Sequence, residues 1–332
     1  MALLPLPRLP AGGRLLRIPG SADVAAAMRT LMPARKRRFP IRDTGPDPGL
    51  FGPGSVTWRV MAEPVLMLGA GRALLMQAAH PLVAEGAIEH STYRTDPYGR
   101  FERTVEWVTV VCFGTTAEAR RACRQVNRLH SAVEGRLRRT HATATVARES
   151  AYSGRDAELL RWVLATFVDT MLVAHDAFVG DLDETDRDRF VREWHAVAAL
   201  MGMPTGSLWT TRAELSEYVA AQLEAGSGAA IPGAGSRLVA ETVLNPPVTS
   251  AAMRPGWAVV TFTTVGLLPP STRRAYGIRW TPAHAAAHRA ITLWLRAGRL
   301  AVPRRLKVSP VHDHALARAE GRLQGAGARE LA

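Results

Sequence analysis

Cysteine and lysine are nearly absent from this sequence. The two cysteines, Cys112 and Cys123, cannot cross-link a chain of 332 residues, and their helical, apolar surroundings favour buried free thiols over a disulfide. We therefore expect a reducing, cytoplasmic location. Lys36 and Lys307 are the only lysines, so arginine supplies nearly all of the 42 basic residues and of the net charge of +13. Such a bias, with abundant alanine, glycine and proline, is typical of a GC-rich genome whatever the function.

Long apolar runs are also missing. The most apolar stretches are 64–84, 158–179 and 256–268; the first two contain charged residues, and the third is too short to cross a bilayer. The N-terminal segment lacks a charged region followed by an unbroken apolar stretch, so no signal peptide is expected. We expect no transmembrane helix, whereas peripheral contact with a membrane stays open.

Several motifs that would indicate a function class are absent. The sequence has no phosphate-binding P-loop, no Gly-x-Ser-x-Gly, no His-Glu-x-x-His and no histidine preceded at i−3 by glutamate, which excludes the corresponding nucleotide, hydrolase, zincin and di-iron sites. The pairs His284/His288 and His312/His314 lack a carboxylate or cysteine at a suitable spacing, so neither is expected to bind a metal. The dense basic run 35–38 has no accompanying zinc-finger or RNP-like pattern, so no specific nucleic-acid partner is expected.

The order of proline, glycine and apolar periodicity predicts an all-α protein with one large helical domain. Residues 1–54 read as a Pro/Gly/Arg-rich arm with one short helix near 21–31, and residues 311–332 as a peripheral C-terminal tail. The helical domain is expected over 55–310. Helices are expected over 56–79, 97–112, 116–137, 157–179, 184–201, 211–223, 235–244, 257–266 and 282–298.

His130 is the first candidate for chemistry. It follows the capping box that begins at Thr115, and we expect it in the middle of a helix, on that helix's apolar face. The residues of that face are Ala119, Ala122, Cys123, Val126, His130, Val133 and Leu137. Spacing alone favours a hydrogen-bonded core histidine, while a neutral imidazole in an apolar cavity is what an axial haem ligand requires.

Two polar groups of residues are the other candidates. Arg100, Arg103 and Thr104 share one face of the helix that begins at Asp96-Pro97, either as a cationic surface stripe or as donors over a bound ligand. His80 follows an apolar helix, where such histidines often only hydrogen-bond the backbone. Glu85, or alternatively Glu89, could act as a base if it is buried, because burial would raise the pKa of its carboxyl.

Five blocks of sequence, taken in order, resemble the rubber-oxygenase (latex-clearing, MpaB-type) family. They contain His80-Pro81 and Glu85, then the Arg-x-x-Arg-Thr run that ends at Thr104, then His130. The blocks are residues 71–86, 90–104, 113–135, 159–163 and 267–277. The resemblance covers roughly 55–310 and implies that this stretch is a catalytic domain, folded as a globin-like or related helical bundle that encloses a haem pocket.

The resemblance implies haem b as cofactor, O₂ as co-substrate and a hydrophobic, unsaturated substrate of isoprenoid or lipid-like character. By position, it implies His130 as the iron ligand, and Arg100, Arg103 and Thr104 as the distal motif. Rubber cleavers have lysine at the position of Arg103, so the resemblance does not carry over their exact substrate. Related chains often have histidine at the position of Leu164. A non-catalytic haem- or lipid-binding module, and a basic nucleic-acid or membrane-surface binder, remain the alternatives.

Overall fold

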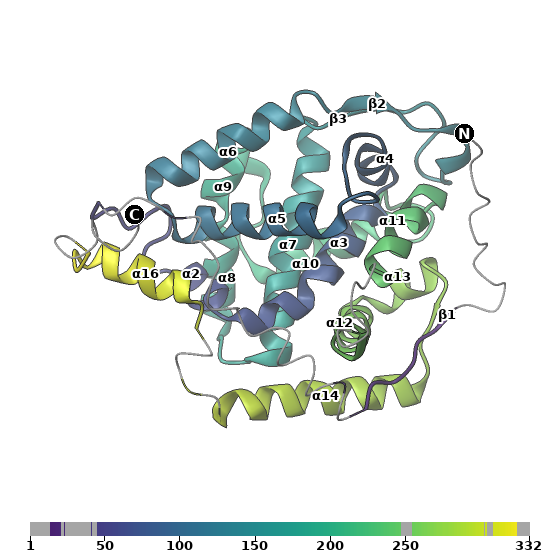
Figure 1. Ribbon diagram of the computed structural model, residues 1–332. Helices are drawn as coiled ribbons and strands as arrows, with labels where there is room; N and C mark the ends of the chain where they lie inside the picture. Colours follow the sequence, from purple (N-terminus) through teal and green to yellow (C-terminus); the bar gives the residue numbers. More distant parts are fainter. Residues whose placement is uncertain are drawn as a thin grey trace.

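The computed structural model describes residues 14–20, 23, 41, 45–246, 254–301, 303 and 308–323. The described residues form an all-α fold, which confirms the predicted fold class (Figure 1). The short helix predicted near 21–31 lies outside these residues except at Asp23, and the basic run 35–38 lies outside them entirely. No described helix is long and apolar enough to cross a membrane.

The first half of the described chain contains α2 (Val56–Met61), a 3₁₀ helix η1 (Pro64–Gly69), α3 (Ala70–Ala79), α4 (Pro81–His90), α5 (Pro97–Phe113), α6 (Thr116–His130) and η2 (Arg139–His141). The second half contains α7 (Ala157–Phe178), α8 (Glu184–Glu193), α9 (His195–Leu200), η3 (Thr205–Ser207), α10 (Arg212–Gln222), α11 (Ala234–Leu244), α12 (Arg254–Leu267), α13 (Pro270–Ala275), α14 (Pro282–Ala301) and α16 (Pro310–Ala319).

Helix starts follow the local capping signals. The Asp96 side chain accepts from the backbone N–H of Gly99, with Pro97 as the first helical residue of α5. Thr115 and Glu118 form the predicted capping box of α6, and Thr211 caps α10 in the same way. Asp156 accepts from two backbone N–H groups at the start of α7. The predicted starts of these helices are confirmed.

Helix ends and interruptions differ more from the prediction. The stretch 56–79, in which the sequence predicts one or two helices, contains α2 and α3 with a 3₁₀ helix that Pro64 opens between them. The stretch 184–201 is divided at Trp194. In contrast, α14 continues through Gly298 to Ala301. The helix α6 ends at His130, so the prediction of a mid-helix histidine is wrong.

Two short strand pairs appear that no alternating pattern predicted. Strand β1 (Arg14–Leu15) pairs in parallel with β4 (Ile278–Arg279), and β2 (Glu134–Arg136) pairs antiparallel with β3 (Ala151–Ser153). The second pair ends α6, because the chain turns after His130 to enter β2. Each strand has only two or three residues, which is too short for a period-two signal.

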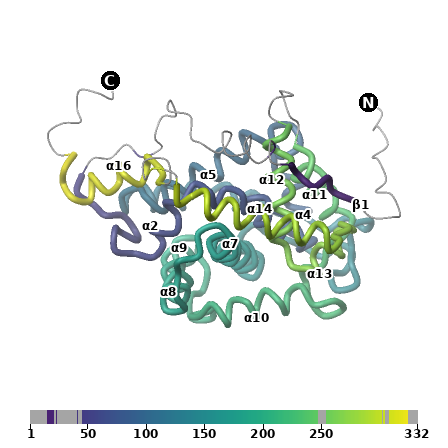
Figure 2. The backbone as a smooth tube through the Cα atoms, turned by 90° about the horizontal axis from the view of Figure 1, so that it is seen from below, coloured from purple at the N-terminus to yellow at the C-terminus, as the bar shows by residue number. Residues whose placement is uncertain are grey.

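Helix α7 runs through the middle of the molecule and is surrounded by other helices in two views at right angles (Figures 1 and 2). It packs against α2, α3, α10, α14 and η1. The core holds large buried side chains such as Trp58, Trp162, Trp194 and Phe178. Cys112 and Cys123 are buried free thiols, as the sequence predicted.

Buried charge links several of these helices. The Arg72 guanidinium of α3 donates to Asp169 Oδ2 of α7 at 2.7 Å and to the Leu267 carbonyl of α12 at 2.9 Å. Arg212 of α10 donates to the other oxygen of Asp169 at 2.8 Å. Near the end of the described chain, the fully buried Arg318 of α16 donates to the Phe113 carbonyl of α5 at 2.8 Å.

Candidate functional site

The predicted site residues gather where the second half of α4, the start of α5, the end of α6 and the β2–β3 pair come together. Helices α5 and α6 are joined at Gly114 and diverge from that turn, so the first residues of α5 and the last residues of α6 lie at the open end of the helix pair (Figure 1). Arg100 and His130 are both found at this open end.

His130 is held in place by the chain that follows it. The backbone N–H of Val133 donates to the His130 carbonyl, and Gly154, just after β3, lies so close that a Cβ there would be 2.6 Å from the same oxygen. The imidazole Nδ1 is buried, and no described residue offers it a hydrogen bond. Burial and the charge of Arg100 lower the pKa of His130 below its ordinary value. His130 is therefore a neutral imidazole with a free buried nitrogen.

Arg100 is the half-buried member of the distal motif. Its Nε donates to Ser91 Oγ at 2.6 Å, and one terminal nitrogen donates to Thr104 Oγ1 at 3.4 Å. Burial and the neighbouring Arg103 lower the pKa of Arg100. The positive charges of Arg100 and Arg103 repel each other, so an anion bound beside them would be favourable.

Arg103 and Thr104 point more toward solvent. The Arg103 side chain is 59% exposed; it donates to Asp96 Oδ2 at 3.2 Å and to Thr92 Oγ1 at 3.0 Å. The Thr104 hydroxyl donates to the Arg100 carbonyl one turn earlier. The structure therefore brings Arg100 and Thr104 together, while Arg103 is attached to the loop before α5.

His80 is buried at the junction of α3 and α4 and acts as the N-cap of α4. Its Nδ1 accepts from the backbone N–H of Leu82 at 3.2 Å, and burial lowers the pKa of His80 to about 4. No hydrogen bond or ion pair among the described residues connects His80 with His130 or Arg100. Its evident role is structural, because only a neutral ring can accept this bond.

Glu85 is fully buried on α4 and has two cationic or polar partners. The His141 Nδ1–H donates to Glu85 Oε2 at 2.5 Å, and Arg138 forms an ion pair with Oε1 at 3.1 Å. His141 is packed against the helix α11, where a Cβ at Gly235 would be 3.0 Å from its Nδ1. The sequence predicted that Glu85 could act as a base only if it is buried. The side chain is indeed buried, and its charge is paired with that of Arg138.

Glu89, one turn further along α4, belongs to the same network. Arg138 donates to it at 3.3 Å, and the Tyr152 hydroxyl of β3 donates to its other oxygen. Burial and this carboxylate raise the pKa of Tyr152. His90 donates to the Glu134 carbonyl at 3.1 Å, which attaches the end of α4 to β2. Both candidate carboxylates are thus connected through Arg138.

Arg138 and His141 are the polar residues that sequence reasoning did not single out. They lie more than fifty positions after Glu85, in a segment with no helical periodicity, and no motif includes them. Only the fold of the β2–β3 region against α4 brings them to the carboxylate.

No cluster of three or more metal-ligating side chains occurs among the described residues. A single axial histidine is enough to hold haem iron, so the comparison is made with His130. Its free, neutral nitrogen and the cationic pair Arg100/Arg103 match the two needs of haem b, which are a lone pair for the iron and cations for the propionates.

Fold and site together define an all-α protein with a cationic, histidine-bearing site at the open end of a helix pair. Over residues 58–297 the chain matches the family described as ER-bound oxygenase mpaB/B'/Rubber oxygenase, catalytic domain. Because the match spans most of the chain, the protein belongs to this oxygenase family, and the resemblance inferred from the sequence is confirmed. No curated protein and no solved structure matches the chain.

Proposed function

We propose that this protein is a haem b-dependent oxygenase that uses O₂ to oxidise a hydrophobic, unsaturated substrate of isoprenoid or lipid-like character. The observation that carries the proposal is the state of His130, whose buried Nδ1 has no hydrogen-bond partner among the described residues and whose ring is kept neutral. Membership of an oxygenase family supports the reaction class, and the family description supports a hydrophobic substrate.

In this proposal each residue has a defined task. His130 holds the iron, Arg100 and Arg103 pair with the propionates, and haem b supplies the iron that activates O₂. Arg100 and Thr104 would donate hydrogen bonds to an oxygen of the substrate or product, Thr104 after its hydroxyl turns away from the Arg100 carbonyl that it now bonds. His80 could contact the cofactor only through Nε2, since its Nδ1 caps α4.

Glu85 is the group that we assign to take up a proton. Its carboxylate is excluded from water, and the His141 Nδ1–H at 2.5 Å and the Arg138 guanidinium at 3.1 Å hold its two oxygens in place. Arg138 contacts both Glu85 and Glu89, and therefore orients the two candidate carboxylates. Arg138 and His141 act through Glu85 as positioning residues.

The absorption spectrum of the purified, haem-reconstituted protein tests the cofactor. We expect a Soret band, and at least a tenfold lower haem content in His130→Ala, because no other described side chain at this place offers a free neutral imidazole. His195→Ala is the matched control, since His195 only hydrogen-bonds the Trp209 carbonyl. The proposal fails if the wild-type protein binds no haem, or if His130→Ala keeps both its haem content and its spectrum.

A non-catalytic haem- or lipid-binding module is the second candidate. The exposure of Arg103 and Thr104, and the attachment of Arg103 to Asp96, favour it, because distal donors of an oxygenase are expected to face the bound cofactor. Oxygen consumption with isoprenoid and unsaturated-lipid substrates distinguishes the two candidates. A haem-loaded protein that consumes no O₂ with any of these substrates would favour the module.

A further inference from the structure

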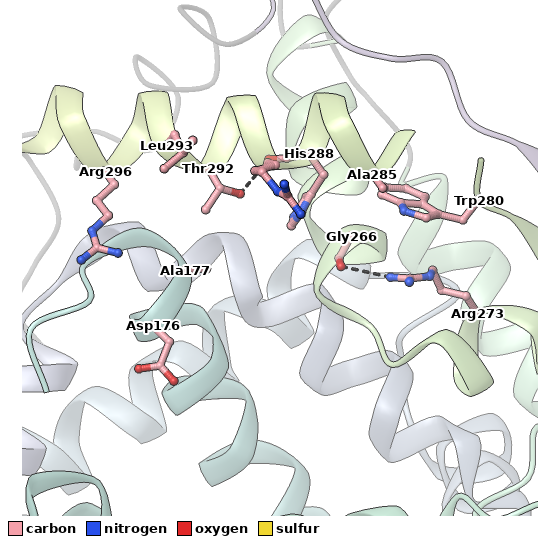
Figure 3. Close-up of a pocket in the computed structure, with 11 residues that line it drawn as sticks. Asp176, Ala177, Gly266, Arg273, Trp280, Ala285, His288, Thr292, Leu293 and Arg296 are labelled. Carbon is pink, nitrogen blue, oxygen red and sulfur yellow. Dashed lines mark hydrogen bonds between the residues drawn. The ribbon is translucent and has the colours of Figure 1, made fainter. Parts of the chain in front are cut away.

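A second polar region lies under α14, away from the candidate oxygenase site. A pocket of about 400 Å³ separates this helix from the C-terminal ends of α7 and α12 and from α13 (Figure 3). Helix α14 contributes His288, Arg289, Leu293 and Arg296 to its wall. Helix α6, which holds His130, lies on the opposite side of the molecule in Figure 1.

The charge that lines this pocket is predominantly positive. Three guanidinium groups, those of Arg273, Arg289 and Arg296, face one carboxylate, that of Asp176. Asp176 is already neutralised from outside the pocket, because Arg187 donates to its Oδ1 at 2.9 Å. The uncompensated charge of the pocket is therefore cationic, which favours an anionic ligand.

Much of the donor capacity of these arginines is unused within the described part of the chain. Arg273 uses one nitrogen to bond carbonyls at the end of α12, including Gly266 at 3.0 Å, and Arg296 uses one nitrogen to bond the Gly180 carbonyl at 3.0 Å. Arg289 is exposed and has no described partner. Each of the first two is thus anchored through one terminal nitrogen, while its other nitrogens can bind a ligand.

His288 is one of the residues that line the pocket. Its ring packs directly on Gly266, where a Cβ would lie 2.0 Å from the imidazole, and its Nε2 is buried without a described partner. Burial and the charge of Arg273 lower the pKa of His288 to about 4. The neutral imidazole of His288 is therefore expected to take up a proton more readily when an anion binds nearby.

Apolar surface borders the cationic groups. The Trp280 ring lies under the Arg273 guanidinium at 5.1 Å, and Leu293 is 59% exposed at the edge of the pocket. An exposed leucine next to Arg289 and Arg296 gives the rim both an anion-binding and an apolar character, which is typical of sites for amphiphilic anions.

We propose that this pocket binds a phosphate group attached to an apolar molecule. A phosphate fits better than a carboxylate, because it offers more acceptor oxygens and up to two negative charges to a wall with three arginines. The phosphate would contact Arg289 and the free nitrogens of Arg273, while the apolar part would lie along Leu293 toward Arg296 at the other end of the pocket (Figure 3). This inference is independent of the oxygenase proposal, since it uses none of the residues at the open end of α5 and α6.

Calorimetric titration of the full chain with inorganic phosphate, and co-sedimentation with phosphatidylcholine vesicles that contain phosphatidic acid, test the proposal at low ionic strength. We expect Arg289→Glu to weaken the binding at least tenfold. Arg120→Glu, an equal change of charge at an exposed position of α6, is expected to change it less than twofold. Binding to the vesicles would support a site for lipid-borne phosphate, whereas binding of inorganic phosphate without binding to the vesicles would show a free-phosphate site and contradict the apolar part of the proposal.

The ring resonances of His288 give an independent measurement. Saturation with the bound form, phosphate or a short-chain phosphatidic acid, is expected to raise the pKa of His288, because an anion stabilises the imidazolium. Absence of binding in both assays, an equal effect of Arg289→Glu and Arg120→Glu, or an unchanged titration of His288 would each overturn the proposal.

Discussion

Burial lowers the pKa of several histidines in the described chain, and three of these neutral rings have clearly different surroundings. His80 accepts a backbone hydrogen bond at the start of α4, His130 presents a free nitrogen beside Arg100, and His288 lies under α14 next to Arg273. In all three, burial is the largest cause of the lowered pKa, and near Arg100 and Arg273 a positive charge lowers it further.

His80 makes the free energy of unfolding depend on pH. Its folded pKa of about 4 is lower than the ordinary 6.5, so below pH 6.5 the unfolded chain takes up a proton that the folded chain does not. Stability is complete above pH 6.5 and decreases toward pH 4, by about 2–3 kcal/mol from this residue at pH 4.5. His80→Asn keeps a good N-cap but cannot titrate, so it is expected to lose correspondingly less stability.

Urea unfolding of both proteins at pH 7 and pH 4.5 measures this difference, and the carboxylates common to both cancel. An equal loss in wild type and His80→Asn would show that His80 does not titrate as inferred.

At the scale of elements, close contact between helices decides where glycine is required. Gly71 lies on α3 where it meets α12, and a Cβ there would be 2.4 Å from Thr264 Oγ1 and 2.9 Å from its methyl group. Gly298 lies in α14 with no heavy atom within 4 Å of the same position. Both are glycines inside helices, but only the first is needed for packing.

The two glycines predict opposite effects of alanine. Gly71→Ala is expected to lower the free energy of unfolding by about 1–3 kcal/mol, because overpacking against Thr264 exceeds the gain in helix propensity. Gly298→Ala is expected to raise it by about 0.5–1 kcal/mol. Chemical denaturation of both variants checks the prediction, and a neutral or stabilising Gly71→Ala would contradict the close packing of α3 on α12.

At the scale of the whole molecule, Asp169 connects helices that are distant in sequence. Arg72 of α3 and Arg212 of α10 bind its two oxygens, and Arg72 also bonds the end of α12. Both Arg72 and Asp169 are buried, so their charges depend on each other for compensation. This ion pair therefore stabilises the relative positions of four helices.

Asp169→Asn is expected to destabilise the protein by about 3–5 kcal/mol, because it leaves two guanidinium groups without a counter-charge. Glu184→Gln, which removes an exposed partner of Arg187, is the control and is expected to cost less than about 1 kcal/mol. Urea unfolding measures both. The combined replacement Arg72→Met and Asp169→Leu should cost less than the sum of the two single changes, and strict additivity would argue against a coupled pair.

Structural features of this protein that depend on residues close together in the sequence can be predicted from it, whereas those that depend on distant residues cannot. The starts of α5, α6, α7 and α10 depend on side chains within three residues of the cap, so the local sequence predicts them. The end of α6 depends on the pairing of β2 with β3, which no local pattern contains, so His130 was expected seven residues before the helix end and is instead its last residue.

The same distinction holds for the candidate site. The sequence by itself determined the all-α class, the family and the candidates His130, Arg100 and Glu85, because periodicity, caps and ordered motifs are local properties of the chain. Only the tertiary structure decided that Glu85 is buried against Arg138 and His141, that Arg103 faces solvent, and that the arginines of α13 and α14 line one pocket. Such contacts join residues far apart in sequence, and their energies depend on burial, which exists only in the folded chain.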